Sequence, residues 1–248
     1  MLLRIRFILL SLFAIAAVSV LASASASAIG RVGACETASV IGGGQWSNSE
    51  CTLTSGAKEY ETKEITSGTE KGTGGEAVLT SELGGAEVSI ICAKGKSTNE
   101  IEPGGATGSG EATFETCTVG NSKERFVTCE VPNVLVKFTS QLIEQASELR
   151  AELKPNEEGK TRFTNIVIKN KGSETCLVKG TFPVTGTAFA LIPNANTLKI
   201  LHLLDFSLAD NKSLKLNGKA ATLSTSISIN VLRGTGALSR YVPFDILH

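Results

Sequence analysis

The sequence predicts an all-β protein: an antiparallel β-sandwich or open barrel of about 10–12 strands, stapled by disulfides and preceded by a cleaved signal peptide. Three observations predict this class. Apolar residues alternate with polar ones over many short runs, clusters of Gly, Pro and Asn separate these runs, and all six cysteines lie beyond an apolar leader. Alternation with a period of two is typical of half-buried antiparallel strands.

The first 28 residues have the three parts of a secretory signal peptide. Arg4 and Arg6 form a basic start, Phe7–Leu21 form an uncharged apolar run, and Ala26-Ser27-Ala28 gives the small-x-small pattern that signal peptidase accepts. The apolar run is shorter than the roughly 20 residues of a transmembrane helix. We therefore expect cleavage after Ala28, an extracellular product and no transmembrane anchor after signal removal.

A second interpretation places a lipid on Cys35. The stretch VGAC at 32–35 resembles the lipobox that precedes the modified cysteine of bacterial lipoproteins. However, a lipobox normally abuts the apolar run, whereas Ser, Ala and Arg31 intervene here. Lipidation would also leave one of the other five cysteines without a partner. Release is favoured, and anchoring through Cys35 is the alternative.

Six cysteines in an exported chain are typical of a disulfide framework. Sequence alone leaves about fifteen pairings open. The alternation of apolar and polar residues places Cys129 and Cys176 on the apolar side of predicted strands, where a bridge between them would be buried. On that ground we prefer the sequential pairing: Cys35–Cys51, Cys92–Cys117 and Cys129–Cys176.

Composition narrows the class of partner. Removal of Arg4 and Arg6 leaves 22 basic and 24 acidic residues, interspersed along the chain. A nucleic-acid-binding protein normally carries a basic patch, so nucleic acid is not expected. No cofactor is expected either, and the glycines before Trp46 lack the Lys-Ser/Thr of a phosphate loop. A cell surface or a polysaccharide is the contact that fits an exported β protein.

The chain divides by composition into a lead-in and a larger domain. Residues 29–75 predict a small disulfide-closed hairpin and a polar linker, because they are rich in Gly, Thr and charge and poor in apolar residues. Residues 76–248 predict the β-sandwich-like domain. Its clearest strand is TLSTSISINV, with Leu223, Thr225, Ile227, Ile229 and Val231 on one face.

Other runs predict strands with an apolar face. These faces are Val88, Ile90 and Cys92; Val127, Cys129 and Val131; Val134, Val136 and Phe138; and Cys176, Val178 and Phe182. Asn217-Gly218 is the best two-residue hairpin turn.

Residues 141–154 allow two interpretations. Leu142, Ala146, Leu149 and Leu153 recur at helical spacing, and Pro155 would end a helix. Alternatively, LRAELK forms a hairpin with RFTNIVIK across PNEEGK. The hairpin is slightly favoured.

Three stretches carry a resemblance to known proteins: CETASVIGGGQWSNSEC, GATGSGEATFETC and ELRAELKPNEEGKTRFTNIVIKNKGSETCLVKGTF. They resemble a group of uncharacterised secreted proteins of soil actinobacteria, which combine a signal peptide with a Cys-containing, Gly/Thr-rich β region. The resemblance covers roughly residues 30–190 in layout and cysteine placement. It implies strands at 149–154, counts against lipidation of Cys35 and transfers no functional residue.

Catalytic signatures are sparse. The mature chain has two histidines, the terminal His248 and His202. His202 shares a strand face with Leu198, Ile200, Leu204, Phe206 and Leu208, whereas Asp205 lies on the other face, so a core histidine is favoured over a base in a pocket. Trp46 is expected to cover the Cys35–Cys51 bridge, and an exposed binding aromatic is the alternative. No closely spaced Cys or His pair indicates a metal site.

Two functions remain. The favoured one is a secreted, non-catalytic β domain with a structural, surface-association or binding role. The alternative is a secreted hydrolase that uses paired carboxylates, with Glu111, Glu115 and Glu130 as the most prominent acids.

Overall fold

A computed structural model describes residues 31–40, 42–49, 51, 53–65, 67–156, 161–193, 195, 201–207, 213–233, 240–242 and 244–247. The predicted signal peptide, residues 1–28, lies outside the described residues. The described chain consists of eighteen strands, more than the sequence predicted, and the all-β, disulfide-stapled fold class is confirmed. Within these residues, no helix is long and apolar enough to span a membrane.

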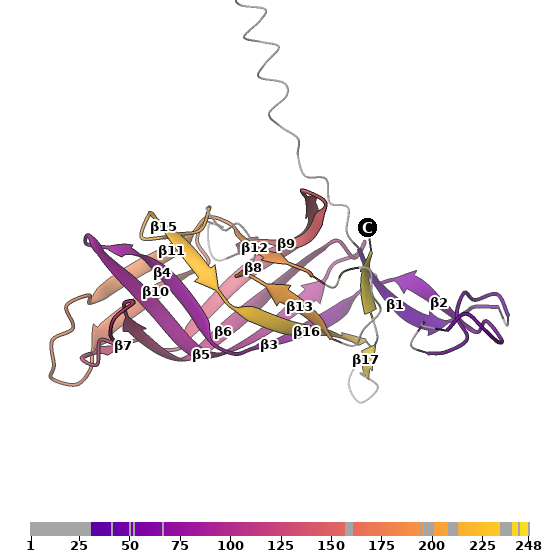
Figure 1. The fold of residues 1–248 in the computed structure, drawn as a ribbon, viewed down its shortest axis with the longest axis horizontal. Helices are drawn as coiled ribbons and strands as arrows, with labels where there is room; N and C mark the ends of the chain where they lie inside the picture. Colours follow the sequence, from indigo (N-terminus) through magenta and orange to yellow (C-terminus); the bar gives the residue numbers. More distant parts are fainter. Residues whose placement is uncertain are drawn as a thin grey trace, which may run out of the picture.

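Eight antiparallel strands close into a barrel (Figure 1). Closure depends on β3 (Gly68–Gly74), which pairs with β5 on one side and with β16 on the other. Around the ring the other strands are β5 (Ala86–Ile101), β6 (Thr107–Gly120), β8 (Val134–Gln145), β9 (Glu148–Pro155), β12 (Ala188–Leu191), β13 (His202–Asp205) and β16 (Ser226–Arg233).

Further strands extend the sheet from the other half of β5. In order of pairing they are β4 (Ala77–Leu83), β15 (Lys219–Ser224), β14 (Lys215–Leu216), β11 (Gly180–Thr185), β10 (Thr164–Asn170) and β7 (Cys129–Glu130). An isolated bridge between Cys117 and Val131 brings the end of this extension back to β6. The extension therefore curls over, and its inner side chains continue the barrel interior.

A separate three-stranded sheet lies at one end of the barrel (Figure 1). It consists of β18 (Phe244–Leu247), β1 (Arg31–Thr37) and β2 (Tyr60–Glu64). The Val32 N–H donates to the Gly105 carbonyl at 3.1 Å, and the Val32 carbonyl accepts from the Ile65 N–H at 2.7 Å. The first bond fixes β1 to the β5–β6 turn, and the second joins it to the residue that follows β2. The last short strand, β17 (Arg240–Val242), pairs with β16.

Strand β3 lies in the segment for which the sequence predicted a polar linker. It enters the barrel wall because its inward positions include Gly72 and Gly74, which permit close approach to the neighbouring strands. A Cβ at Gly72 would collide with the Ser97 hydroxyl and would lie 2.8 Å from Ile227 Cγ2. A strand can thus be built from residues that carry almost no apolar signal.

The predicted alternation is confirmed along β15 and β16. Thr225, Ile227, Ile229 and Val231 are buried, whereas the serines between them face outward or are half-buried. One predicted face is wrong: Val127 is 72% exposed, although Cys129 and Val131 are buried. The reason is a turn in which the Cys129 N–H donates to the Phe126 carbonyl, so alternation does not extend back to Val127.

Residues 141–154 are extended, as favoured, but the predicted partner is wrong. β9 pairs with β8 and β12, and β10 pairs instead with β11 and β7. The β8–β9 turn is formed by Ala146 and Ser147, with φ of 55° and 63°. These residues rarely adopt such φ values and give no turn signal. The predicted Asn217-Gly218 turn is present between β14 and β15, with φ of 51° and 77°.

The inward face changes phase halfway along β5. Ile90 and Cys92 point inward before the change, and Ser97, Asn99 and Ile101 point inward after it. Cys92 lies opposite Cys117 of β6, next to Thr116, whose φ is 56°. Irregular backbone on both strands re-aims the side chains without altering their pairing register.

The three disulfides join Cys35 to Cys51, Cys92 to Cys117 and Cys129 to Cys176, and no described cysteine is free. This is the sequential pairing that strand geometry favoured. Each bridge links segments close in sequence. Cys35–Cys51 links β1 to the loop that precedes β2, and Cys92–Cys117 joins β5 to β6. Cys129–Cys176 holds the β6–β8 and β10–β11 connections together.

We expect the combined substitution of Cys129→Ala and Cys176→Ala to destabilise the protein. Loss of a bridge that closes a 47-residue loop costs about 4 kcal/mol in the chain-entropy account. Urea denaturation of oxidised samples measures the free energy of unfolding. Stability within about 0.5 kcal/mol of the unaltered chain would contradict this role.

Candidate ligand-binding cavity

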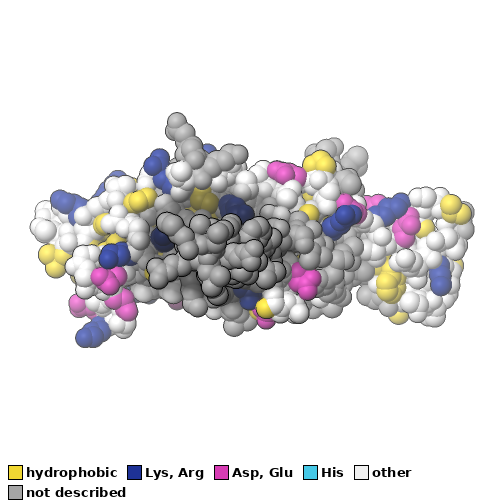
Figure 2. Space-filling model, turned by 90° about the horizontal axis from the view of Figure 1, so that it is seen from above, with side chains coloured by type: hydrophobic (Ala, Val, Ile, Leu, Met, Phe, Trp, Pro, Cys, Tyr) yellow, Lys and Arg dark blue, Asp and Glu magenta, His cyan; other side chains and the backbone are white. Residues whose placement is uncertain are grey.

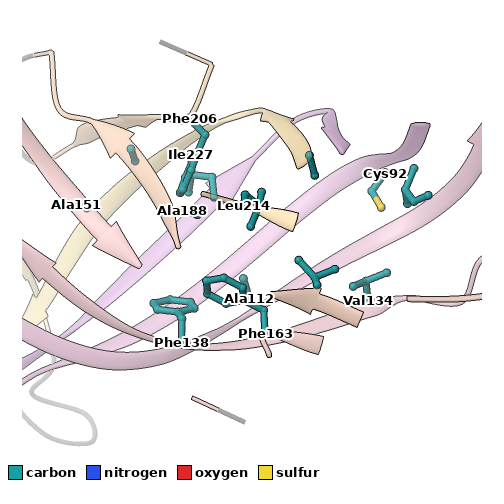
Figure 3. Close-up of a cluster of buried hydrophobic side chains, with 14 of the residues drawn as sticks. Cys92, Ala112, Val134, Phe138, Ala151, Phe163, Ala188, Phe206, Leu214 and Ile227 are labelled. Atoms are coloured by element: carbon teal, nitrogen blue, oxygen red, sulfur yellow. The ribbon is translucent and has the colours of Figure 1, made fainter. Parts of the chain in front are cut away.

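The barrel encloses a cavity with a volume of about 160 Å³, lined mainly by apolar side chains. Figure 3 shows these side chains on facing walls: Phe138, Phe163, Ala112 and Val134 on one side, and Phe206, Ile227, Leu214 and Ala188 on the other. These residues come from strands and connections that are distant in sequence and that the fold brings together.

The cavity is elongated along β5. Its lining on this strand runs from Ile90 through Cys92, Ser97 and Asn99 to Ile101. At about 3.3 Å per residue, this is roughly 35 Å of strand. The residues that line the cavity therefore extend along much of the barrel interior.

A cluster of three polar side chains interrupts the apolar lining. Glu70 of β3 and Asn99 of β5 are cross-strand partners, and Asn99 Nδ2 donates to Glu70 Oε2 at 2.6 Å. Ser140 Oγ of β8 donates to Asn99 Oδ1 at 3.3 Å. All three line the cavity, and Asn99 is only 8% exposed. We call Glu70, Asn99 and Ser140 the polar cluster.

Glycines on β6 make the polar cluster geometrically feasible. β6 lies between β5 and β8, and its inward positions at this level are Gly108 and Gly110. A Cβ at Gly108 would lie 2.7 Å from Asn99 Nδ2. Because these positions carry no side chain, Asn99 and Ser140 can meet across the strand that separates them.

Glu70 is the ionisable member of the cavity lining: the other lining residues of the described chain are apolar or carry neutral amide, hydroxyl or disulfide groups. Desolvation by burial raises the pKa of Glu70 above its ordinary value of 4.5, and the hydrogen bond from Asn99 opposes this in part. The cavity thus holds one carboxyl group whose charged form lacks a basic counterion in the lining.

The two side chains singled out in the sequence lie away from this cluster. Trp46 is half-buried near β2, where its backbone N–H donates to the Tyr60 carbonyl at 2.9 Å. His202 is 1% exposed, on the same face as Leu204 and Phe206, whereas Asp205 lies on the other face. His202 belongs to the barrel core and does not line the cavity. Leu198, Ile200, Leu208 and His248 fall outside the described residues.

The acids proposed for hydrolysis are not brought together in the cavity. Glu111 and Glu130 are exposed, and Glu115 forms an ion pair with Lys96 at 3.4 Å. A second hollow, with a volume of about 170 Å³, contains Glu102 and Glu152. Glu152 is already bound to Lys154 at 2.8 Å. In the part of the chain that the structure describes, no three His, Cys, Asp or Glu side chains form a metal-binding group.

On the side shown in Figure 2, the described outer surface has no cluster of charged or hydrophobic side chains comparable to the polar cluster. Lys, Arg, Asp and Glu side chains are interspersed there among its described residues, and hydrophobic side chains occur singly. Such a mixture is typical of a solvated surface. The cavity inside the barrel is the candidate site, because its lining brings polar side chains together within apolar surroundings.

Sequence reasoning did not find Glu70. The residue stands in TSGTEKGTGG, a charged stretch that resembles a linker. The sequence does indicate a close approach of groups beside the strand TGSGEATF. Gly108, Gly110 and Ala112 are small residues that share one face of this strand. Small residues on one face of a strand indicate close approach of neighbouring groups.

Comparisons with known proteins give no relative: no protein-family model, no curated protein and no solved structure matches this chain. The candidate site is therefore defined by its own geometry.

We expect Glu70→Gln to stabilise the protein at neutral pH. Below pH 4.5 the carboxyl is protonated in both the folded and unfolded chain and contributes no difference. As pH rises from 4.5 through the raised pKa, ionisation favours the unfolded chain, and each pH unit between the two pKa values costs about 1.4 kcal/mol. Gln keeps an oxygen that accepts from Asn99 but does not ionise.

Urea denaturation at pH 4 and pH 7 measures this effect. Glu100→Gln is the matched control, because Glu100 is exposed on the same strand as Asn99. A stability difference between Glu70→Gln and the unaltered chain that does not grow with pH would contradict the burial of the charge.

Proposed function

We propose that this protein is an extracellular binding protein that holds a small, mostly apolar molecule inside its barrel. The observation that carries the proposal is the cavity of about 160 Å³, lined mainly by apolar side chains within a closed eight-stranded ring. Eight-stranded barrels are at the size where the interior is either filled by side chains or retains room for one small ligand.

The cavity volume supports this reading. An apolar cavity of about 150 Å³ stays dry and binds benzene. Burial of apolar ligand surface contributes about 25 cal/mol per Å², so a molecule of eight or so carbon atoms gains enough to bind measurably. A few polar groups within an apolar lining are the usual composition of ligand sites.

The disulfides indicate an oxidising environment outside the cytoplasm. We further propose that the chain is secreted and released by cleavage after Ala28. Two features support release over anchoring through Cys35. Its sulfur is bonded to Cys51, and cleavage before Cys35 would remove residues 31–34, which pair with β18 and include the buried Val32. Resemblance to secreted actinobacterial proteins and contact with a cell surface or polysaccharide stay predictions.

We expect n-octanol, a neutral eight-carbon probe, to bind the unaltered protein with one site. Ala188→Phe places a ring in the cavity and should weaken this binding at least tenfold; Ala151→Leu is a milder filling variant. Ala220→Phe is the control, since Ala220 is exposed on β15. Isothermal titration calorimetry measures the affinity, and melting temperatures verify folding. Equal affinity in the filled, folded variants would exclude the cavity as the site.

We also expect the exported protein to yield a peptide pair linked through Cys35 and Cys51 under non-reducing digestion. Mass spectrometry of the intact product should give the mass of the chain that begins at Ile29. A lipid mass on Cys35 would instead show that the protein is anchored.

A further inference from the structure

We propose that the polar cluster of Glu70, Asn99 and Ser140 binds the primary ammonium head of a linear alkylamine, whose chain lies along β5 in the cavity. This inference rests on the proposed function and adds the chemical class of the ligand.

Charge is the first reason for an ammonium group. Glu70 lines the cavity, and no Lys, Arg or His is among the described residues that line it. A carboxylate held in apolar surroundings gains most from a ligand that supplies the missing positive charge. A carboxylate-bearing ligand would place two like charges at this end of the cavity, which disfavours fatty acids.

Hydrogen-bond capacity is the second reason. An ammonium group has three donors and no acceptor. The polar cluster offers acceptors in excess: Glu70 has two carboxyl oxygens, and among the described residues Asn99 is the donor to them, at Oε2. Asn99 Oδ1 and Ser140 Oγ provide further lone pairs beside it. A hydroxyl head could use only one of these acceptors as a donor.

The position of the cluster gives the ligand its orientation. Asn99 lies near one end of the lined part of β5, and Ile90 lies at the other. From Asn99 toward Ile90 the lining becomes apolar, with Cys92 of β5, Leu79 of β4 and Ile166 of β10. A head group at Glu70 thus directs its tail toward the apolar part of the lining, and the length of that lining suits an unbranched chain.

Calorimetric titration with n-octylamine, n-octanol and n-octanoate at pH 7 tests the inference on the unaltered protein. The three probes share chain length and differ in the head group. We expect octylamine to bind at least tenfold more tightly than octanol, and octanoate to bind most weakly. This ranking requires no variant and so does not depend on how a substitution folds.

Glu70→Gln then identifies the residue responsible. Loss of a charge-assisted hydrogen bond should weaken octylamine binding about tenfold to a hundredfold. Octanol binding should change less than about threefold, because an amide still accepts a hydrogen bond. Glu100→Gln, on the outer face of the same strand as Asn99, should leave all three affinities unchanged.

The outcomes separate this inference from the proposed function. If octanol binds in the cavity but octylamine is not preferred, or if Glu70→Gln keeps the preference, the ammonium site is overturned and the apolar binding function stands. If none of the three probes binds the folded, unaltered protein, both are overturned.

Discussion

Closure of the barrel by β3 is the constraint on which the rest of the structure depends. This strand pairs along its whole length with β5 and from Thr69 to Gly74 with β16, and so removes the two sheet edges that would otherwise face solvent. Without β3, the walls that bear Phe138 and Phe206 would not enclose a common interior. The cavity and the burial of Glu70 are therefore consequences of one strand pairing.

That strand is polar, and its composition explains how closure is compatible with an internal cavity. Gly72 and Gly74 let β3 approach Ser97 and Ile227 closely, while Glu70 supplies the one inward carboxyl. Glycines at 108 and 110 have the same effect on β6, where they leave space for Asn99 and Ser140 to meet. Small inward residues on two strands thus create room that larger aliphatic residues would fill.

The sequence is informative wherever one strand face is apolar. Thr225, Ile227 and Ile229 are identified as inward by alternation alone, and the structure buries them. The same logic supports the Cys129–Cys176 bridge, because alternation places both cysteines on the apolar side of their segments. The turn at Asn217-Gly218 is also predictable from the sequence, since both residues tolerate the positive φ that a tight hairpin requires.

The sequence does not predict features that depend on the pairing of distant strands. Nothing local distinguishes β8 from β10 as the partner of β9, and Ala146-Ser147 forms a tight turn without turn residues. The phase change between Cys92 and Ser97 reverses which residues of β5 face inward, so continued alternation from Ile90 would place Asn99 outside. Glu70 is missed for the most general reason: a charged residue in a Gly-rich stretch is normally solvated, and only barrel closure buries it.

A half-buried carboxyl that is desolvated inside the barrel works against the stability of the fold. Desolvation raises the pKa of Glu70, and the neutral Asn99 amide that donates to it stabilises its charge less than a basic partner would. An apolar residue at this position would fill space and remove the ionisation cost, so folding alone does not account for the polar cluster. Positions where a structure departs from the arrangement that best stabilises it are where function is expected. In this barrel that departure consists of a cavity and of an acid for which the described lining provides no basic partner, and both lie in the same place.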